Sequence, residues 1–170
     1  IANDFFRQSA PEKLTSRGIT NATDVANINT YRNEVRVLRA YAYYNLMDMF
    51  GKAPFYDENS AINSQGPEYS RQQLFTFIES ELNAVLPNLK APRTNEYGRV
   101  DQGVANMILA KIYLNAEVYI GAQKYTECMA KCSTVITSGY ALNTNYLNNF
   151  KADNNTSSEI IFTLQSDGRV

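Results

Sequence analysis

The sequence predicts an all-α fold, an array of antiparallel helix pairs with a short β segment near the C-terminus. Three observations support this. Apolar residues recur at helical spacing in several long segments, and Gly or Pro follows most of these segments. A helical pattern recurs after 70 residues. Only residues 159–165, EIIFTLQ, have the composition of a strand. We expect residues 1–170 to form a single helical-repeat domain.

Composition argues against several classes of function. The net charge of −1 is not the basic surplus typical of proteins that bind nucleic acid or anionic membranes. The chain has no His, which removes the commonest general base and the commonest zinc ligand. The sequence contains no run of 18 apolar residues, so it predicts no membrane-spanning helix. The closest carboxylate pairs, Asp57 with Glu58 and Glu79 with Glu81, are poorly placed for glycoside hydrolysis. These observations argue against His-dependent catalysis and against glycoside hydrolysis.

The longest predicted helix organises the chain. Residues 1–10 resemble the end of a helix that Pro11 stops. We expect the long helix to run from about Asp24 to Phe50, with Thr23 as its N-cap and Thr30 as the alternative start. Apolar residues occupy most of its circumference, so it should lie between other helices. Three arginines, at positions 32, 36 and 39, lie along roughly one face and predict structural ion pairs.

The next helix follows a long connection. Gly51 and then Pro54 should end the long helix, and residues 55–69 have no helical period. Long ordered loops are often functional. Ser70 and Gln73 have the spacing of a capping box and predict a helix that ends or kinks at Pro87.

Two further helices complete the predicted array. After a second loop at 90–99, Asp101 should cap a helix from about Gln102 to Tyr119, and Gly121 should break it. A fourth helix is expected at about 122–138. Its predicted buried residues are Tyr125, Cys128, Met129, Cys132, Val135 and Ile136. Two cysteines four apart on a helix suit neither a disulfide nor a metal site, so we expect both to be small buried core residues.

The C-terminal part of the chain changes character. Residues 159–165 predict one strand, but no second strand is evident, and a single strand leaves its backbone groups without partners. Together with the helical stub at residue 1, this suggests a piece of something larger.

The repeat joins residues 38–51 to residues 108–121. Ala40, Tyr43, Asn45 and Gly51 each meet an identical residue at an offset of 70. Each of the two helices is followed by a second, antiparallel helix, which is the arrangement of tetratricopeptide-type repeats. Such pairs stack into curved arrays that act as scaffolds.

Three blocks of residues carry a resemblance to a known family. The first contains Glu34, Arg36, Leu38-Arg39-Ala40, Tyr43-Tyr44, Phe50-Gly51 and Pro54-Phe55. The second contains Gly98-Arg99-Val100-Asp101, Ala105 and the run from Leu109 to Ala116. The third contains Val135-Ile136, Gly139-Tyr140, Leu142, Tyr146, Phe150, Asn154-Asn155 and the run from Glu159 to Phe162. In this order, over residues 31–165, the blocks resemble the signatures of the SusD/RagB family.

This resemblance implies a surface-exposed lipoprotein of the outer membrane in Bacteroidota. Family members bind an oligosaccharide or polysaccharide, cap a SusC-like TonB-dependent transporter, and are not enzymes. The resemblance implies a tetratricopeptide-like scaffold and a lipid anchor at an N-terminus that this chain does not include. Members are much longer than this chain, which resembles the scaffold part, and no ligand residue of the family is carried over.

Loop residues are the candidates for glycan contact. Aromatic faces pack against sugar rings, and neutral amides pair with hydroxyl groups. Tyr56 and Tyr69 flank the long loop, and Arg93, Asn95 and Tyr97 lie in the second loop. The alternative for each is a loop residue that packs on the scaffold.

Two further alternatives concern a bound calcium ion and a protein or peptide partner. Asp153 and Glu159, with the asparagines between them, offer oxygen ligands for calcium, but the spacing is not that of an EF-hand, and a polar turn is the alternative. The alternative function is a helical-repeat adaptor that binds a protein or peptide on its concave face.

Overall fold

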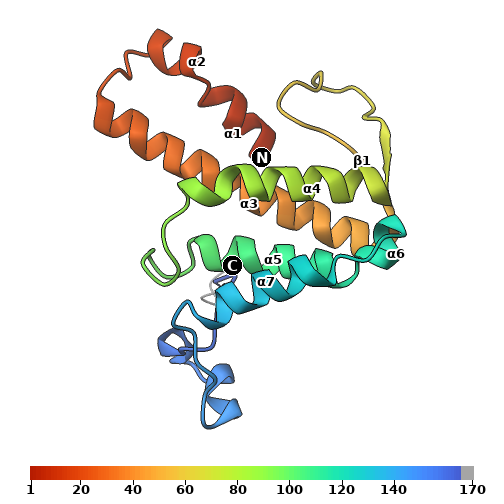
Figure 1. Cartoon of the computed structure of the whole chain (residues 1–170). Coiled ribbons are helices and arrows are strands. Elements are labelled where there is room, and N and C mark those ends of the chain that lie inside the picture. The colour runs from red at the N-terminus through yellow and green to blue at the C-terminus, as the bar shows by residue number, and fades with distance from the viewer. Residues whose placement is uncertain (166–170) are drawn as a thin grey trace.

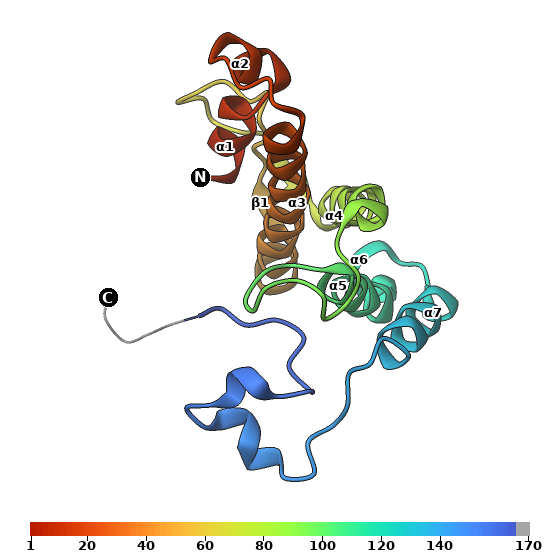
Figure 2. The ribbon, with the colours of Figure 1, turned by 90° about the vertical axis from the view of Figure 1, so that its left-hand side faces the viewer.

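The computed structural model describes residues 1–165 and confirms the array of helix pairs (Figures 1 and 2). Helix α3 pairs with α4, and α5 pairs with α7, each pair antiparallel. The helices are α1 (Ala2–Gln8), α2 (Pro11–Ser16), α3 (Ala22–Phe50), α4 (Arg71–Val85), α5 (Gln102–Leu114), α6 (Ala116–Ile120) and α7 (Tyr125–Ile136). Short 3-10 turns are η1 (Leu86–Asn88), η2 (Tyr146–Phe150) and η3 (Asn154–Thr156). No helix among the described residues has both the length and the apolar character needed to cross a membrane.

Three predicted helix ends are confirmed by the structure. Gly51 ends α3 in the left-handed region, with φ of 74°. Ser70 and Gln73 form the predicted capping box of α4. The side chain of Asp101 accepts hydrogen bonds from the backbone of Gly103 and Val104 at the start of α5. The N-cap of α3 is Asn21 and not Thr23, because the Asn21 amide oxygen accepts from the N–H groups of Thr23 and Asp24.

Three other boundaries differ from the prediction. Pro11 begins α2 instead of only ending α1, because proline suits the first turn of a helix. The helix predicted to reach Tyr119 breaks at Asn115, whose side chain competes for the Lys111 carbonyl, and α6 follows. The last helix is shorter than expected and begins at Tyr125.

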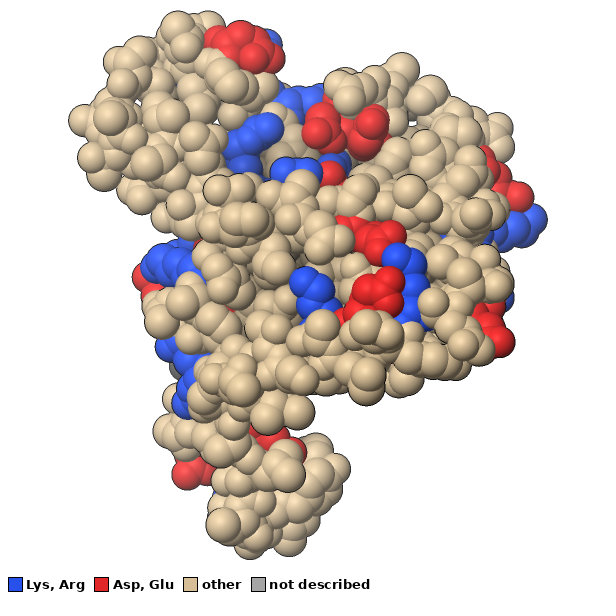
Figure 3. All heavy atoms as spheres, in the orientation of Figure 1, with Lys and Arg blue, Asp and Glu red and all other residues tan. Residues whose placement is uncertain are grey.

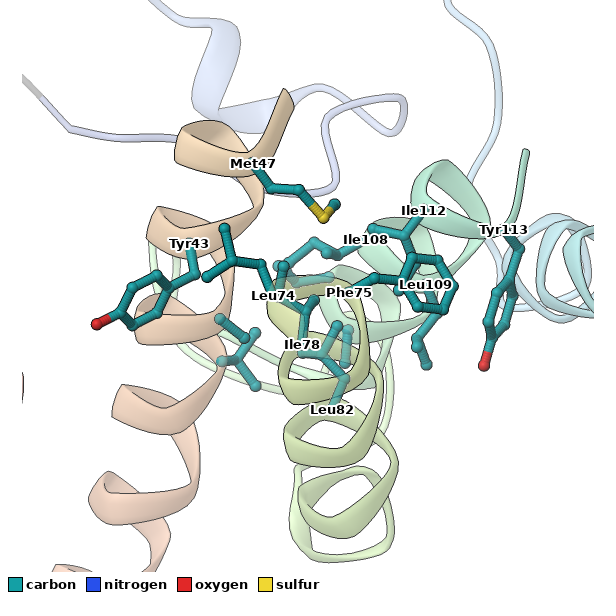
Figure 4. Packing of buried hydrophobic residues seen from close by; sticks show 14 of the residues in the cluster. Tyr43, Met47, Leu74, Phe75, Ile78, Leu82, Ile108, Leu109, Ile112 and Tyr113 are labelled. Carbon is teal, nitrogen blue, oxygen red and sulfur yellow. The ribbon is translucent and has the colours of Figure 1, made fainter. Parts of the chain in front are cut away.

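The core lies between the two helix pairs (Figure 4). Met47 of α3 packs with residues of α4 and α5, including the fully buried Leu74, Phe75 and Leu109. Burying a large apolar side chain stabilises a fold by about 1.5–3 kcal/mol, so this shared cluster holds the two pairs together.

The outer face of α7 is exposed, which corrects the predicted burial. Cys128 and Val135 are buried against the core, whereas Tyr125, Met129, Cys132 and Ile136 are exposed. Helix α7 lies at the end of the array, so only one of its faces meets another helix (Figure 2). The prediction that both cysteines are buried is therefore wrong for Cys132.

Helix α3 is covered less completely than its sequence suggests. It packs against α1, α4, α5 and β1. The stripe of Val35, Leu38, Ala42 and Leu46 instead lines an open apolar groove of about 740 Å³, which continues onto α1 and the Tyr56 region.

The β structure is in a different place from the one predicted. Strands β1 (Lys52–Pro54) and β2 (Glu68–Ser70) form a two-stranded antiparallel sheet, with Ala53 opposite Tyr69, and close the long loop. The strand predicted at 159–165 is wrong, because this segment finds no partner strand within the described residues. Ile161 and Phe162 pack against the core instead.

Candidate functional site

A polar hollow of about 210 Å³ lies between the second loop and the C-terminal segment. We call it the loop–tail pocket. Its walls come from the loop before α5 and from irregular residues after α7. The lining residues are Arg93, Asn95, Glu96, Tyr97, Gly98, Arg99, Asp101, Tyr140, Asn155, Ser157 and residues 160–163.

Asp101 organises the wall that the loop contributes. One carboxylate oxygen caps α5, and the other accepts a 2.8 Å hydrogen bond from the backbone N–H of Arg93. Asp101 is buried, with only 5% of its surface exposed. Arg93 has a φ of 63°, a left-handed conformation that costs energy for a residue with a Cβ atom. The bond to Asp101 compensates this strain and fixes the direction of the loop.

Tyr140 forms the opposite wall. Its ring lies 5.5 Å from the Arg93 guanidinium, and Arg93 also donates a 2.9 Å hydrogen bond to the carbonyl of Ser158. Arg93 thus joins the loop to the tail. Burial and the nearby Asp101 carboxylate raise the pKa of Tyr140 to about 12, so its hydroxyl is protonated at neutral pH. That hydroxyl occupies the space that a side chain at Gly103 would fill.

Asn95 has an architectural role in this pocket. Its amide donates to the Val100 carbonyl at 2.8 Å and to the Glu34 carboxylate at 3.2 Å. Arg99 holds the same carboxylate through two hydrogen bonds of 2.6 and 3.1 Å. These contacts tie the second loop to α3, so Asn95 has only part of its amide left for a ligand.

Tyr97 presents the most accessible aromatic side chain of the pocket. The residue is 46% exposed, and its ring has no aromatic or cationic partner among residues 1–165. Its carbonyl accepts a 2.9 Å hydrogen bond from the side chain of Gln165. An open ring beside polar groups is suited to packing against a sugar ring.

Tyr56 and Tyr69 lie elsewhere. Tyr69 stacks on Phe55 with ring centroids 4.1 Å apart and joins the edge of the core. The backbone N–H and carbonyl of Tyr56 both bond to the Tyr43 hydroxyl, at 2.8 and 2.9 Å, and Tyr56 lines the apolar groove. The structure therefore brings Arg93, Asn95 and Tyr97 together but keeps Tyr56 and Tyr69 apart from them.

Sequence reasoning missed Tyr140 and the tail residues that close the pocket. They lie in an irregular stretch, and no periodic signal points to their partners. The local signs were Gly139, which ends the preceding turn with φ of 84° and redirects the chain, and the place of Tyr140 in the third block of the family resemblance.

The calcium candidates do not form a ligand cluster. Among residues 1–165, no three His, Cys, Asp or Glu side chains converge on one point. Glu159 accepts hydrogen bonds from the Asn143 backbone and the Asn149 amide, which lower its pKa. Asp153 precedes the turn η3, where its carbonyl accepts from Thr156. Glu159 thus shapes the tail, in agreement with the polar-turn alternative.

Comparison with known proteins gives a consistent group of relatives. No family model matches the chain. The chain is 38% identical over 157 residues to the starch-binding protein SusD of Bacteroides thetaiotaomicron. The matched region covers 90% of this chain and 27% of that protein. Surface glycan-binding protein A of Bacteroides uniformis is similar in structure, with a TM-score of 0.73 and 25% sequence identity. The superposed region covers 95% of this chain and 34% of the Bacteroides uniformis chain.

One similar structure contains a bound oligosaccharide. It is surface glycan-binding protein A from Bacteroides thetaiotaomicron in complex with laminarihexaose, with a TM-score of 0.69, 26% identity, and coverage of 95% of this chain and 32% of that one. The chain thus spans about a quarter to a third of the length of these relatives.

Proposed function

This chain belongs to the SusD/RagB family, and from that premise we propose that it is part of a glycan-binding protein of an outer-membrane nutrient-uptake system. One observation carries the proposal. The chain is 38% identical, over nine-tenths of its length, to a protein named for starch binding. The structural likeness to a protein seen with laminarihexaose supports the same conclusion.

The loop–tail pocket is our proposed point of contact with glycan in this chain. Tyr97 offers an open ring face and Arg93 places guanidinium donors in the same pocket, whereas Asn95 offers only its amide oxygen, because both of its N–H groups are already bonded. Tyr56 and Tyr69 remain weaker proposals, because the ring of Tyr69 is stacked on Phe55.

The proposed setting follows from family membership. We propose a surface-exposed lipoprotein of the outer membrane that delivers its oligosaccharide to a SusC-like TonB-dependent transporter. In this setting the helix pairs supply a rigid scaffold, and the chain holds the glycan without cleaving it. The single-domain organisation of residues 1–170 also remains a proposal.

The test is calorimetry with maltoheptaose and laminarihexaose. We expect Tyr97→Ala to weaken binding by about two- to tenfold, because stacking on an aromatic face contributes about 0.5–1.5 kcal/mol. Tyr125→Ala is a matched control, because Tyr125 is 45% exposed but lies on α7, outside the pocket. An equal loss in both variants would argue against the loop–tail pocket. No binding of either glycan by the unaltered protein would argue against glycan binding.

The apolar groove favours one alternative, a helical-repeat adaptor. Its walls carry Leu38, Leu46 and Phe5, with few polar groups. Such a surface suits the apolar side of a peptide or helix better than a hydroxyl-rich sugar. An adaptor would retain a protein partner and show no heat of binding with either oligosaccharide.

A further inference from the structure

A second polar hollow, of about 380 Å³, lies apart from the loop–tail pocket and shares no residue with it. We call it the arginine pocket. Phe6 of α1, the N-terminal half of α3, Glu58, Glu81 and Asn88 surround it. Figure 3 shows basic and acidic side chains gathered in a hollow between the α1–α2 region and the long loop. Its volume is within the range of about 300–1,000 Å³ that is common for small-molecule sites.

Two of the arginines here are already neutralised. Arg36 donates two hydrogen bonds to the Glu81 carboxylate, at 2.7 and 3.1 Å. Arg39 contacts Glu81 at 3.0 Å and Glu58 at 2.5 Å. Two positive and two negative charges therefore balance within this network.

Arg32 is a positive charge without a carboxylate partner in residues 1–165. Its guanidinium donates to the Phe6 carbonyl at 3.0 Å and to the Ser9 hydroxyl at 2.7 Å, and it lies 5.4 Å from the Phe6 ring centroid. The residue is only partly exposed. Nearby Arg7 likewise donates only to backbone carbonyls, those of residues 57, 58 and 60. A partly desolvated cation with neutral partners favours the approach of an anion.

Three asparagines with unused amides complete the pocket. Asn29 and Asn33 lie one turn apart on α3, and Asn88 lies on η1. The described part of the chain provides no side-chain hydrogen bond for any of the three. Each amide offers a carbonyl oxygen and two N–H donors, the combination that pairs with neighbouring hydroxyl groups.

We propose that the arginine pocket binds a sugar unit that carries a carboxylate, as in a uronic-acid oligosaccharide. The carboxylate pairs with Arg32, and the ring hydroxyls pair with the amides of Asn29, Asn33 and Asn88. Glu58 has one carboxylate oxygen that accepts no hydrogen bond from the described residues and is available to a hydroxyl. This inference rests on the proposed glycan-binding function and specifies an acidic ligand class for a separate pocket.

The test is calorimetry with trigalacturonic acid and with maltotriose, a neutral sugar of the same length, at low and high salt. We expect tighter binding of trigalacturonic acid, with an affinity that falls as salt screens the charge. Arg32→Gln should lower the affinity for trigalacturonic acid by at least tenfold and leave the affinity for maltotriose unchanged. The double variant Asn29→Ala, Asn33→Ala should weaken the acidic ligand by about fivefold or more.

Asn27→Ala is the matched control, because Asn27 is an exposed asparagine on the same helix but outside the pocket. Arg32 also holds α1, so circular dichroism must show native helix content for Arg32→Gln. If that variant unfolds, the asparagine double variant still tests the proposal, because neither side chain makes a hydrogen bond within residues 1–165 that the substitution would remove.

The outcomes separate the two proposals. Wild-type affinity for trigalacturonic acid in the asparagine double variant would overturn the arginine pocket, as would equal affinity for the acidic and neutral sugars. Binding of maltoheptaose that depends on Tyr97, without any binding of trigalacturonic acid, would overturn this inference alone. Failure to bind any of these sugars would overturn the proposed function as well.

Discussion

Single buried polar residues connect segments that are distant in the sequence. Asp101 joins the second loop to α5, Glu34 joins α3 to the same loop through Arg99, and Arg39 joins α3 to α4 through Glu81. All three residues at the centre of these contacts are less than 9% exposed. A buried polar group that loses its partner costs more than the bond contributed, so these positions should be sensitive to substitution.

We predict that Asp101→Ala lowers the free energy of unfolding by about 2–4 kcal/mol. The substitution removes a helix N-cap and leaves the Arg93 N–H without its acceptor. Urea denaturation measures the change. Asn21→Ala, which removes the exposed cap of α3, should cost only about 1 kcal/mol. Equal effects would contradict the joining role of Asp101.

Glu81 should contribute a pH-dependent part of the stability. Burial disfavours its charged form, but hydrogen bonds from Arg36 and Arg39 outweigh burial and place its pKa below the ordinary value of 4.5. A carboxyl group with a lowered pKa in the folded state stabilises the protein above its unfolded pKa. This contribution is lost as the pH falls through the folded pKa. We therefore expect stability to decrease below about pH 4.5.

Glu81→Gln tests this expectation. At pH 7 the variant should be less stable by about 1–3 kcal/mol, because hydrogen bonds to a charged acceptor are lost. Between pH 5 and pH 3 its stability should change less than that of the unaltered protein. Parallel pH profiles from thermal unfolding would refute the assignment to Glu81.

At the scale of elements, α7 shows how position in the array determines burial. Val135 and Ile136 are neighbours, yet the first is 7% exposed and the second 73%. We predict that Val135→Ala costs about 1–2 kcal/mol, because two buried methyl groups are removed, and that Ile136→Ala changes stability by less than about 0.5 kcal/mol. Urea denaturation of both variants measures the contrast. A large cost for Ile136→Ala would mean that something covers the outer face of α7.

At the scale of the whole molecule, the two helix pairs share one core. Met47 from the first pair is fully buried in a cluster that includes Ile108 and Ile112 from the second. Unfolding one pair would expose the core face of the other, so we expect a single cooperative transition. Far-ultraviolet circular dichroism and tyrosine fluorescence should give the same midpoint. Met47→Ala should lower the stability by about 2–5 kcal/mol and keep one transition. Two separate transitions would contradict the single-domain proposal.

Much of the architecture was predictable from local sequence. The capping box at Ser70, the cap at Asp101 and the left-handed turn at Gly51 each depend on a few neighbouring residues, and the structure confirms all three. Helical periodicity identified the long helices, because it too depends only on residues that are close in the sequence. The prediction of a strand at 159–165 was wrong, because a strand requires a partner strand and local composition does not show whether one is present.

The candidate site was less predictable. The sequence placed Arg93, Asn95 and Tyr97 in one loop, but it could not show that Tyr140 closes the pocket or that Glu34 engages Asn95. By itself the sequence determined which long segments are helical, three of their ends at Gly51, Ser70 and Asp101, and the family to which the chain belongs. Only the tertiary structure decided which apolar faces stay open, and which arginines, Arg32 among them, have no carboxylate partner within residues 1–165. Caps and helices depend on interactions within a few residues, whereas burial and ion pairing depend on segments that meet only after folding.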